Sequence, residues 1–326
     1  MQSNQQTHVA LSASRGVIFV LTAALLWGTG GVVKQTIAEL APTNALSIAF
    51  FRMGFSVPVL GLVCALALRG AMLRIARRDL AITLFIGGLT GVYQAMYFGA
   101  ISEVGVSIAT LIALCVAPIV VAIESVVFMK ERLTARVLVA MGCAIGGIVL
   151  LTGFQTHVPG NTLSGMALAA GSATAYGTVT VISRALSRQS HPLQTATFGF
   201  SFGALILFGL ANISTTGLVV SYPPMGWVWL LYLGVMPTAL AYALFLSGMR
   251  STPATVASIF TLAEPLMAAV LAWIIFGERL NRLGFVGAGL LLVAMLALVV
   301  KHPPRRSIRT ADNSVENTIK EVSQLR

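Results

Sequence analysis

The sequence predicts an all-α integral membrane protein whose ten transmembrane helices form two inverted five-helix repeats. Of its 326 residues, 57% are hydrophobic and only 10% are charged, and the mean hydropathy is +0.89. Soluble domains carry about 25% charged residues, because their whole surface must be solvated. The apolar residues fall in ten long runs, and the second half of the chain repeats a pattern found in the first.

Ten apolar segments are long enough to span a bilayer, since about 20 helical residues cross ~30 Å of hydrocarbon. The gaps between them are too short to hold a soluble domain. Residues 1–15 and 301–326 are predicted to be cytoplasmic tails, and the apolar spacing in the second fits either a short surface helix or a solvated end. The predicted spans are residues 16–36, 43–68, 80–101, 105–128, 134–153, 163–185, 193–212, 226–248, 253–276 and 281–300.

Basic residues predict the orientation of the spans, because cytoplasmic loops are enriched in Lys and Arg. With ten spans, Lys34, Arg279 and Arg282 lie on one side of the membrane and Arg52 lies within a span. All other Lys and Arg residues fall on the side of the two termini, which we therefore place in the cytoplasm, with the chain in the cell inner membrane. This bias accounts for the net charge of +11. Aromatic side chains are not interleaved with the basic ones, so we expect no nucleic-acid partner.

The chain contains an internal repeat. Pro118 and Pro265 are 147 residues apart in the related segments "APIVVAIESVVFMKERL" and "EPLMAAVLAWIIFGERL". Nearer the N-terminus of each copy, "LLWGT" precedes "TAYGT" by 149 residues. Residues 16–153 and 163–300 are therefore predicted to be two copies of one five-helix unit. Because five is an odd number of crossings, the second copy is inverted relative to the first, an arrangement typical of alternating-access transporters.

These motifs carry a resemblance to a known family. The ten-span inverted repeat, "WGTGGVV" in the first span, "FFRMGF" in the second and "EPLMAAVLAWIIFGERL" in the ninth resemble the EamA-type transporters of the drug/metabolite transporter superfamily. The resemblance covers about residues 16–300. It implies a permease for a small metabolite, most often an exporter of amino acids or related compounds, with a central cavity lined by spans 1, 3, 4, 6, 8 and 9. The four-span multidrug relatives carry a Glu in their first span, whereas here that span holds only Lys34 near its outer end.

Glu264 is the main candidate for the substrate site, because it lies near the middle of the ninth span. A charge at that depth costs at least about 2.5 kcal/mol, so it needs a function or a partner. One interpretation is a carboxylate in the cavity that meets an amine or takes up a proton. The other is a structural Glu that ties helices together. Its counterpart in the first repeat is Ala117, so the repeat itself does not require an acid.

Four further residues are unusual inside apolar spans. Pro118 and Pro265 each remove a backbone donor and kink a helix, which makes them candidates for matched hinges or cavity walls, with a purely shape-setting kink as the alternative. Arg52 and Glu124 are interpreted as structural charges that pair with a neighbour or reach toward the membrane surface.

The remaining cavity candidates combine a mid-span position with a large side chain that has a polar tip. Such side chains suit a cavity for amphipathic solutes. The alternative is that they anchor span ends at the membrane interface, where Trp and Tyr are enriched. These candidates are Trp27, Tyr93, Gln94, Tyr97, Tyr176 and Tyr242.

The sequence lacks the motifs that are typical of common enzyme classes. The segment "GFSFG" (199–203) matches G-x-S-x-G, but it lies mid-span and all four His residues fall outside the spans. HExxH, CxxC and Walker A motifs are absent from the sequence. We therefore expect no enzyme, no cofactor and no metal site.

The predicted function is export of amino acids or related compounds by alternating access, driven by an ion gradient or by exchange. The alternative is an importer of a vitamin, nucleoside or amine on the same scaffold. A passive channel or a non-transporting membrane protein is more distant, since no repeated selectivity-filter signature is visible. The expected partners are a small-molecule substrate, the lipid bilayer and, where a carboxylate titrates during transport, protons. The chain is expected to act as a monomer or homodimer.

Overall fold

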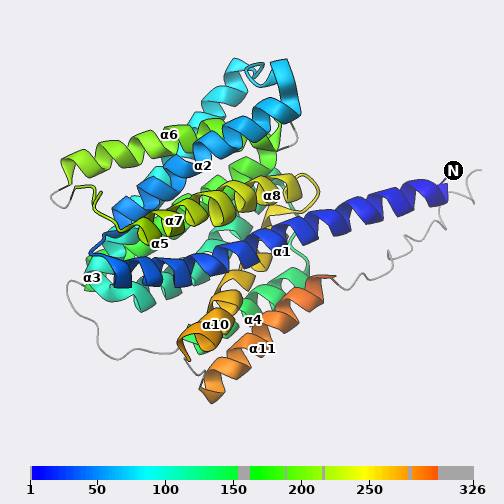
Figure 1. Cartoon of the computed structure of the whole chain (residues 1–326). Helices are drawn as coiled ribbons and strands as arrows, with labels where there is room; N and C mark the ends of the chain where they lie inside the picture. Colours follow the sequence, from blue (N-terminus) through cyan, green and yellow to red (C-terminus); the bar gives the residue numbers. More distant parts are fainter. Residues whose placement is uncertain (1, 153–161, 188, 215–216, 278–280, 300–326) are drawn as a thin grey trace, which may run out of the picture.

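The computed structural model describes residues 2–152, 162–187, 189–214, 217–277 and 281–299. The predicted C-terminal tail and the repeat residues 278–280 lie outside these ranges. Every regular element within them is helical (Figure 1). In chain order the elements are α1 (Gln2–Leu40), α2 (Ala45–Leu68), η1 (Arg69–Ala71), α3 (Arg77–Met129), α4 (Ala135–Thr152), α5 (Thr162–Leu186), α6 (Pro192–Ile213), α7 (Pro224–Gly234), η2 (Val235–Leu240), α8 (Ala241–Gly248), α9 (Ala254–Phe260), α10 (Ala263–Phe276) and α11 (Arg282–Val299).

The ten predicted spans are confirmed as helical segments. In the described residues, nine segments are long and apolar enough to cross a membrane, and the shorter apolar helix Arg282–Leu298 makes the tenth. Two predicted spans are joined in α3, which changes direction at Gly105. The backbone there has φ +79° and ψ 164°, a region open essentially only to glycine, so Gly105 allows two spans to follow one another without a loop.

The two repeats make the same helix contact twice. A Cβ placed on Gly28 of α1 would lie 2.6 Å from Cβ of Met267 in α10, and one on Gly177 of α5 would lie 2.8 Å from Cγ1 of Val120 in α3. Gly28 and Gly177 are separated by 149 residues, and Val120 and Met267 by 147, which are the two repeat offsets. The structure thus agrees with the predicted architecture of two inverted five-helix repeats.

The helices divide into a central group and two flanking pairs. Figure 1 shows α4 beside α11 at one side of the bundle and α2 beside α6 at the other. Between them, α1 packs on α10 and α8, and α3 packs on α5. The largest buried apolar cluster joins these groups and includes Trp27, Phe200, Phe245 and Phe260. The side chains of this cluster are therefore shielded from lipid by other helices.

Two spans of the second repeat are irregular near their middle. The ninth span is interrupted at residues 261–262, so that α9 ends and α10 begins directly before Glu264 and Pro265. In the first repeat the helix continues through Pro118. The eighth span runs through α7, the π-helical segment η2 and α8. Short π-helical segments and helix breaks in membrane proteins often mark functional positions, because their backbone groups must be satisfied by protein or by a wet cavity.

Candidate functional site

Three charged side chains from both repeats lie close enough inside the bundle to interact electrostatically. Lys34 lies on α1, Arg52 on α2 and Glu264 in the first turn of α10. All three are half-buried, and Glu264 interacts electrostatically with both Lys34 and Arg52. Bringing two cations to one carboxylate offsets part of the cost of placing charges in an apolar bundle. Negative charge in the first turn of α10 also complements the positive end of that helix dipole.

Aromatic side chains form a connected layer beside these charges. The hydroxyls of Tyr93 and Tyr242 are 3.1 Å apart and share a hydrogen bond. The ring of Tyr93 contacts that of Tyr176, with centroids 5.6 Å apart, and Tyr242 contacts Trp27 at 4.9 Å. Tyr242 also interacts electrostatically with Arg52. The layer therefore joins α1, α3, α5 and α8 next to the charge cluster.

The two remaining predicted cavity residues, Tyr97 and Gln94, lie outside the aromatic layer. Tyr97 shares a hydrogen bond of 2.5 Å with the Thr110 hydroxyl across the two arms of α3, and its side chain interacts electrostatically with Glu264. Gln94 instead packs between α3 and α2, where its Nε2 lies 3.7 Å from Sδ of Met53. Four of the six predicted residues thus form the aromatic layer and Tyr97 interacts with Glu264. Gln94 lies apart from them because it follows Tyr93 directly and faces about 100° away on the helix.

Two nitrogen donors at the site have no hydrogen-bond partner among the described residues. They are Nε1 of Trp27 and Nε of Arg52, and both atoms are buried. The Trp27 side chain is only 9% exposed. A buried donor left unpaired costs about 1–3 kcal/mol, and such groups are rare in folded proteins. Trp27 contacts Tyr242, which interacts electrostatically with Arg52, so the two donors indicate a place where a ligand or water completes the bonding.

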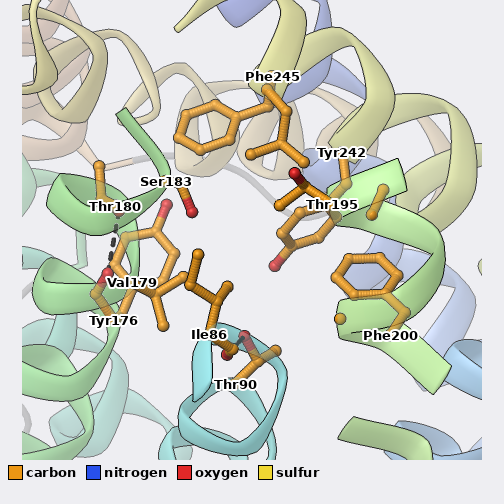
Figure 2. Close-up of a pocket in the computed structure, with 13 residues that line it drawn as sticks. Ile86, Thr90, Tyr176, Val179, Thr180, Ser183, Thr195, Phe200, Tyr242 and Phe245 are labelled. Atoms are coloured by element: carbon orange, nitrogen blue, oxygen red, sulfur yellow. Dashed lines mark hydrogen bonds between the residues drawn. The ribbon is translucent and has the colours of Figure 1, made fainter. Parts of the chain in front are cut away.

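A small, mainly apolar pocket continues the site toward the loop between α5 and α6. Figure 2 shows Tyr176 and Tyr242 on opposite sides of it, with Ile86 and Thr90 of α3 between them. Further lining comes from Val179, Ser183, Phe200, Phe245 and Leu246. Tyr176 and Tyr242 therefore belong both to the pocket and to the aromatic layer.

The other residues singled out in the sequence serve different contacts. Glu124 accepts a hydrogen bond of 2.6 Å from the Thr178 hydroxyl and so ties α3 to α5, as a structural charge would. Arg52, predicted as a structural charge that pairs with a neighbour or reaches toward the membrane surface, interacts electrostatically with Glu264. Lys34, near the outer end of its span, follows Trp27 by seven residues, two helical turns along one face. That spacing is the sequence signal that identifies it.

Comparison with known proteins identifies the family. The description of the matching family model is "EamA-like transporter family", and the match covers residues 14–153 and 163–300. The chain belongs to the EamA-like transporter family. The two matched ranges nearly coincide with the two predicted repeats, and the resemblance found in the sequence is confirmed. The protein is accordingly a multi-pass membrane protein of a transporter family.

Relatives in this family extend over almost the whole chain. The uncharacterized transporter YwfM of Bacillus subtilis (strain 168) is 28% identical over 90% of this chain and 96% of its own length. The uncharacterized inner membrane transporter YicL of Salmonella typhimurium is 27% identical over 92% of this chain and 99% of its own. One solved crystal structure matches with a TM-score of 0.73 at 22% identity, covering 88% of this chain and 96% of that one. This last match shows a shared fold.

Proposed function

We propose that this member of the family is a carrier that moves a small organic metabolite across the membrane by alternating access of its two inverted repeats. The observation that carries the proposal is the central cluster of Lys34, Arg52 and Glu264, to which both repeats contribute. Charges held inside an apolar bundle are expensive, and in membrane proteins they mark substrate or ion pathways. Their position between two inverted units matches the location of the site in repeat-based carriers.

The irregular helices next to the cluster support movement at this place. The break before Glu264 and the π-helical segment η2 interrupt two spans of the second repeat at the level of the aromatic layer. Such interruptions let a helix bend without losing a long ladder of hydrogen bonds. Since both repeats pack through equivalent glycine contacts, each can take the conformation of the other as the molecule changes state.

Energy for transport comes, in this proposal, from exchange or from an ion gradient, since the sequence has no Walker A motif.

We place the chain in the cell inner membrane with both termini in the cytoplasm, on the distribution of Lys and Arg residues. Reporter fusions after residue 326 and within residues 153–161 test this orientation. Net export, rather than import, stays a prediction from the family resemblance.

Counterflow into proteoliposomes tests the carrier proposal directly. The purified protein is reconstituted and assayed with labelled carboxylic acids, amino acids, amines and nucleosides. A carrier gives saturable uptake that is accelerated by the same solute on the opposite side. Flux that rises linearly with concentration and lacks this acceleration contradicts the proposal and indicates a channel.

A pair of carboxylate variants links that activity to the site. Glu264→Gln is expected to change the rate or its pH dependence, whereas Glu124→Gln, which only weakens the tie to Thr178, is expected to transport as the parent does. If both variants keep the parent rate and pH profile, Glu264 is structural and the proposed site is wrong.

A further inference from the structure

Deepening the proposed carrier function, on which this step rests, we infer that the central site binds a small organic monoanion, rather than a zwitterion or an amine. Its carboxylate lies beside Trp27 and Lys34 of α1 and Arg52 of α2.

The charges at the site leave one cation in excess. Lys34 and Glu264 interact electrostatically with each other, and each also interacts with Arg52. Two cations and one carboxylate carry a net positive charge when all are ionised. In an apolar bundle an uncompensated charge is far more costly than in water. A ligand with a single negative charge removes that cost, and a neutral or cationic ligand does not.

The unpartnered atoms at the site are donors only. An indole nitrogen and a guanidinium cannot accept a hydrogen bond, so Nε1 of Trp27 and Nε of Arg52 require an acceptor from the ligand. A carboxylate offers two oxygens with about four acceptor positions, and bonds from a charged donor to it are stronger than neutral ones. The donor set therefore matches an anion.

Space for the anion lies along one face of α1. Trp27, Gly31 and Lys34 follow one another at spacings of four and three residues, which places them on the same side of the helix. A Cβ placed on Gly31 would meet no atom within 4 Å, whereas the neighbouring Gly28 packs tightly against α10. The absence of a side chain at residue 31 thus leaves room between the indole and the ammonium group.

An ammonium group on the ligand has no favourable place in this arrangement. Its natural partner is Glu264, but that carboxylate already interacts with Lys34 and Arg52. An incoming amine would lie next to two fixed cations, and like charges at short range in a low dielectric repel strongly. The sequence leaves open whether Glu264 meets an amine, takes up a proton or ties helices together; in this proposal it is the counter-ion of the two cations.

Three ligands that share one body test the inference. Thermal stability of the detergent-purified protein is measured with 3-phenylpropionate, phenylalanine and phenethylamine at millimolar concentrations, where binding to the folded state raises Tm. We expect a rise with 3-phenylpropionate, a smaller rise with phenylalanine and none with phenethylamine. A larger rise with phenylalanine or phenethylamine, or no rise with 3-phenylpropionate, overturns the inference.

Variants with a matched control localise the binding. Trp27→Phe keeps the ring and removes the donor, and is expected to weaken 3-phenylpropionate binding about tenfold. Gly31→Leu is expected to abolish binding without lowering Tm, because it fills open space. Gly289→Leu is the control, since Gly289 on α11 also has no atom within 4 Å of its Cβ position but lies away from the site. Binding that survives Gly31→Leu contradicts the placement of the anion.

Glu264→Gln separates the two roles of the carboxylate. If it is the counter-ion, the variant keeps or strengthens 3-phenylpropionate binding; if it binds an amine, the variant loses phenylalanine selectively. The binding assay does not depend on transport across a membrane. Its result therefore tests the anion inference independently of the proposed carrier function. Anion binding without counterflow of any solute refutes the carrier, and saturable counterflow of another solute without anion binding refutes this inference.

Discussion

The two repeats pack in the same way but contribute opposite charges to the site. Gly28 in the first and Gly177 in the second make equivalent contacts with a neighbouring helix. The first repeat supplies the two cations, Lys34 and Arg52, whereas the second supplies the carboxylate, Glu264. Symmetry is therefore kept at these helix contacts and lost in the charges of the candidate site. In the proposed carrier, the repeats exchange conformations while the site keeps one chemical character.

Residues that correspond between the two repeats show how this difference in charge arises. Lys34 corresponds to Ser183 at the offset of 149 residues, and Ser183 lines the apolar pocket. Trp27 corresponds in the same way to Tyr176, and the hydrogen-bonded residues Tyr93 and Tyr242 are also 149 residues apart. The aromatic layer is thus nearly symmetric, while one end beyond it is cationic and the other apolar.

Removing a cation from the first repeat is expected to have the largest effect. Arg52→Met leaves Lys34 and Glu264 as a neutral pair and removes an unpartnered donor, so transport of the solute identified by counterflow is expected to fall about 100-fold in kcat/KM. The double variant Arg52→Met/Glu264→Gln restores one cation in excess and is expected to recover part of the loss. Initial rates of counterflow measure both effects. Parent-like transport by Arg52→Met would show that the charges are structural.

Equal packing in the two repeats predicts equal sensitivity. Gly28→Ala and Gly177→Ala each place a Cβ within 3 Å of a side-chain carbon across a helix contact, so each is expected to lower stability by about 1–3 kcal/mol. Gly289→Ala, in open space, is expected to be neutral or slightly stabilising. Thermal unfolding in detergent gives the comparison. Sensitivity at only one of Gly28 and Gly177 would mean that the two contacts are not equivalent in energy.

The sequence predicted the fold and most of the site for definite physical reasons. Hydropathy locates spans because a bilayer requires long apolar helices, and the repeat offsets align them into two units. Trp27 and Tyr176 could be identified from their matching mid-span positions. Lys34 was missed because a basic residue near a span end is normally explained by the membrane surface. The break before Glu264 and the π-helical η2 depend on tertiary packing, which a local pattern does not encode.

The hydrogen bond across the aromatic layer tests how closely the two repeats are coupled. Tyr93→Phe and Tyr242→Phe each remove one partner of the 3.1 Å bond, and each is expected to cost about 0.5–1.5 kcal/mol. Because both variants remove the same bond, the double variant is expected to cost less than the sum of the two. A double-mutant cycle on Tm measures this coupling. Additive effects would show that the bond does not link the repeats energetically.

The smallest expected effect concerns the caps of α2 and α6, the second helix of each repeat. Asn44 caps α2 by accepting a hydrogen bond from Ser47 N at 2.7 Å, and His191 caps α6 through Nδ1, which accepts from Leu193 N at 3.3 Å. Burial, and to a lesser degree the positive charge of Arg250, lower the pKa of His191 from its usual 6.5. The neutral imidazole, which alone can accept at this cap, is therefore favoured in the folded protein.

The lowered pKa of His191 fixes the sign of the pH effect. Since the folded pKa lies below the unfolded one, the contribution to stability is complete above about pH 6.5 and is lost as the pH falls through the folded pKa. His191→Asn replaces this cap with one that does not titrate. Between about pH 7.5 and pH 5, Tm of the parent is expected to fall more than that of the variant. Parallel decreases would show that the α6 cap, like that of α2, is insensitive to pH.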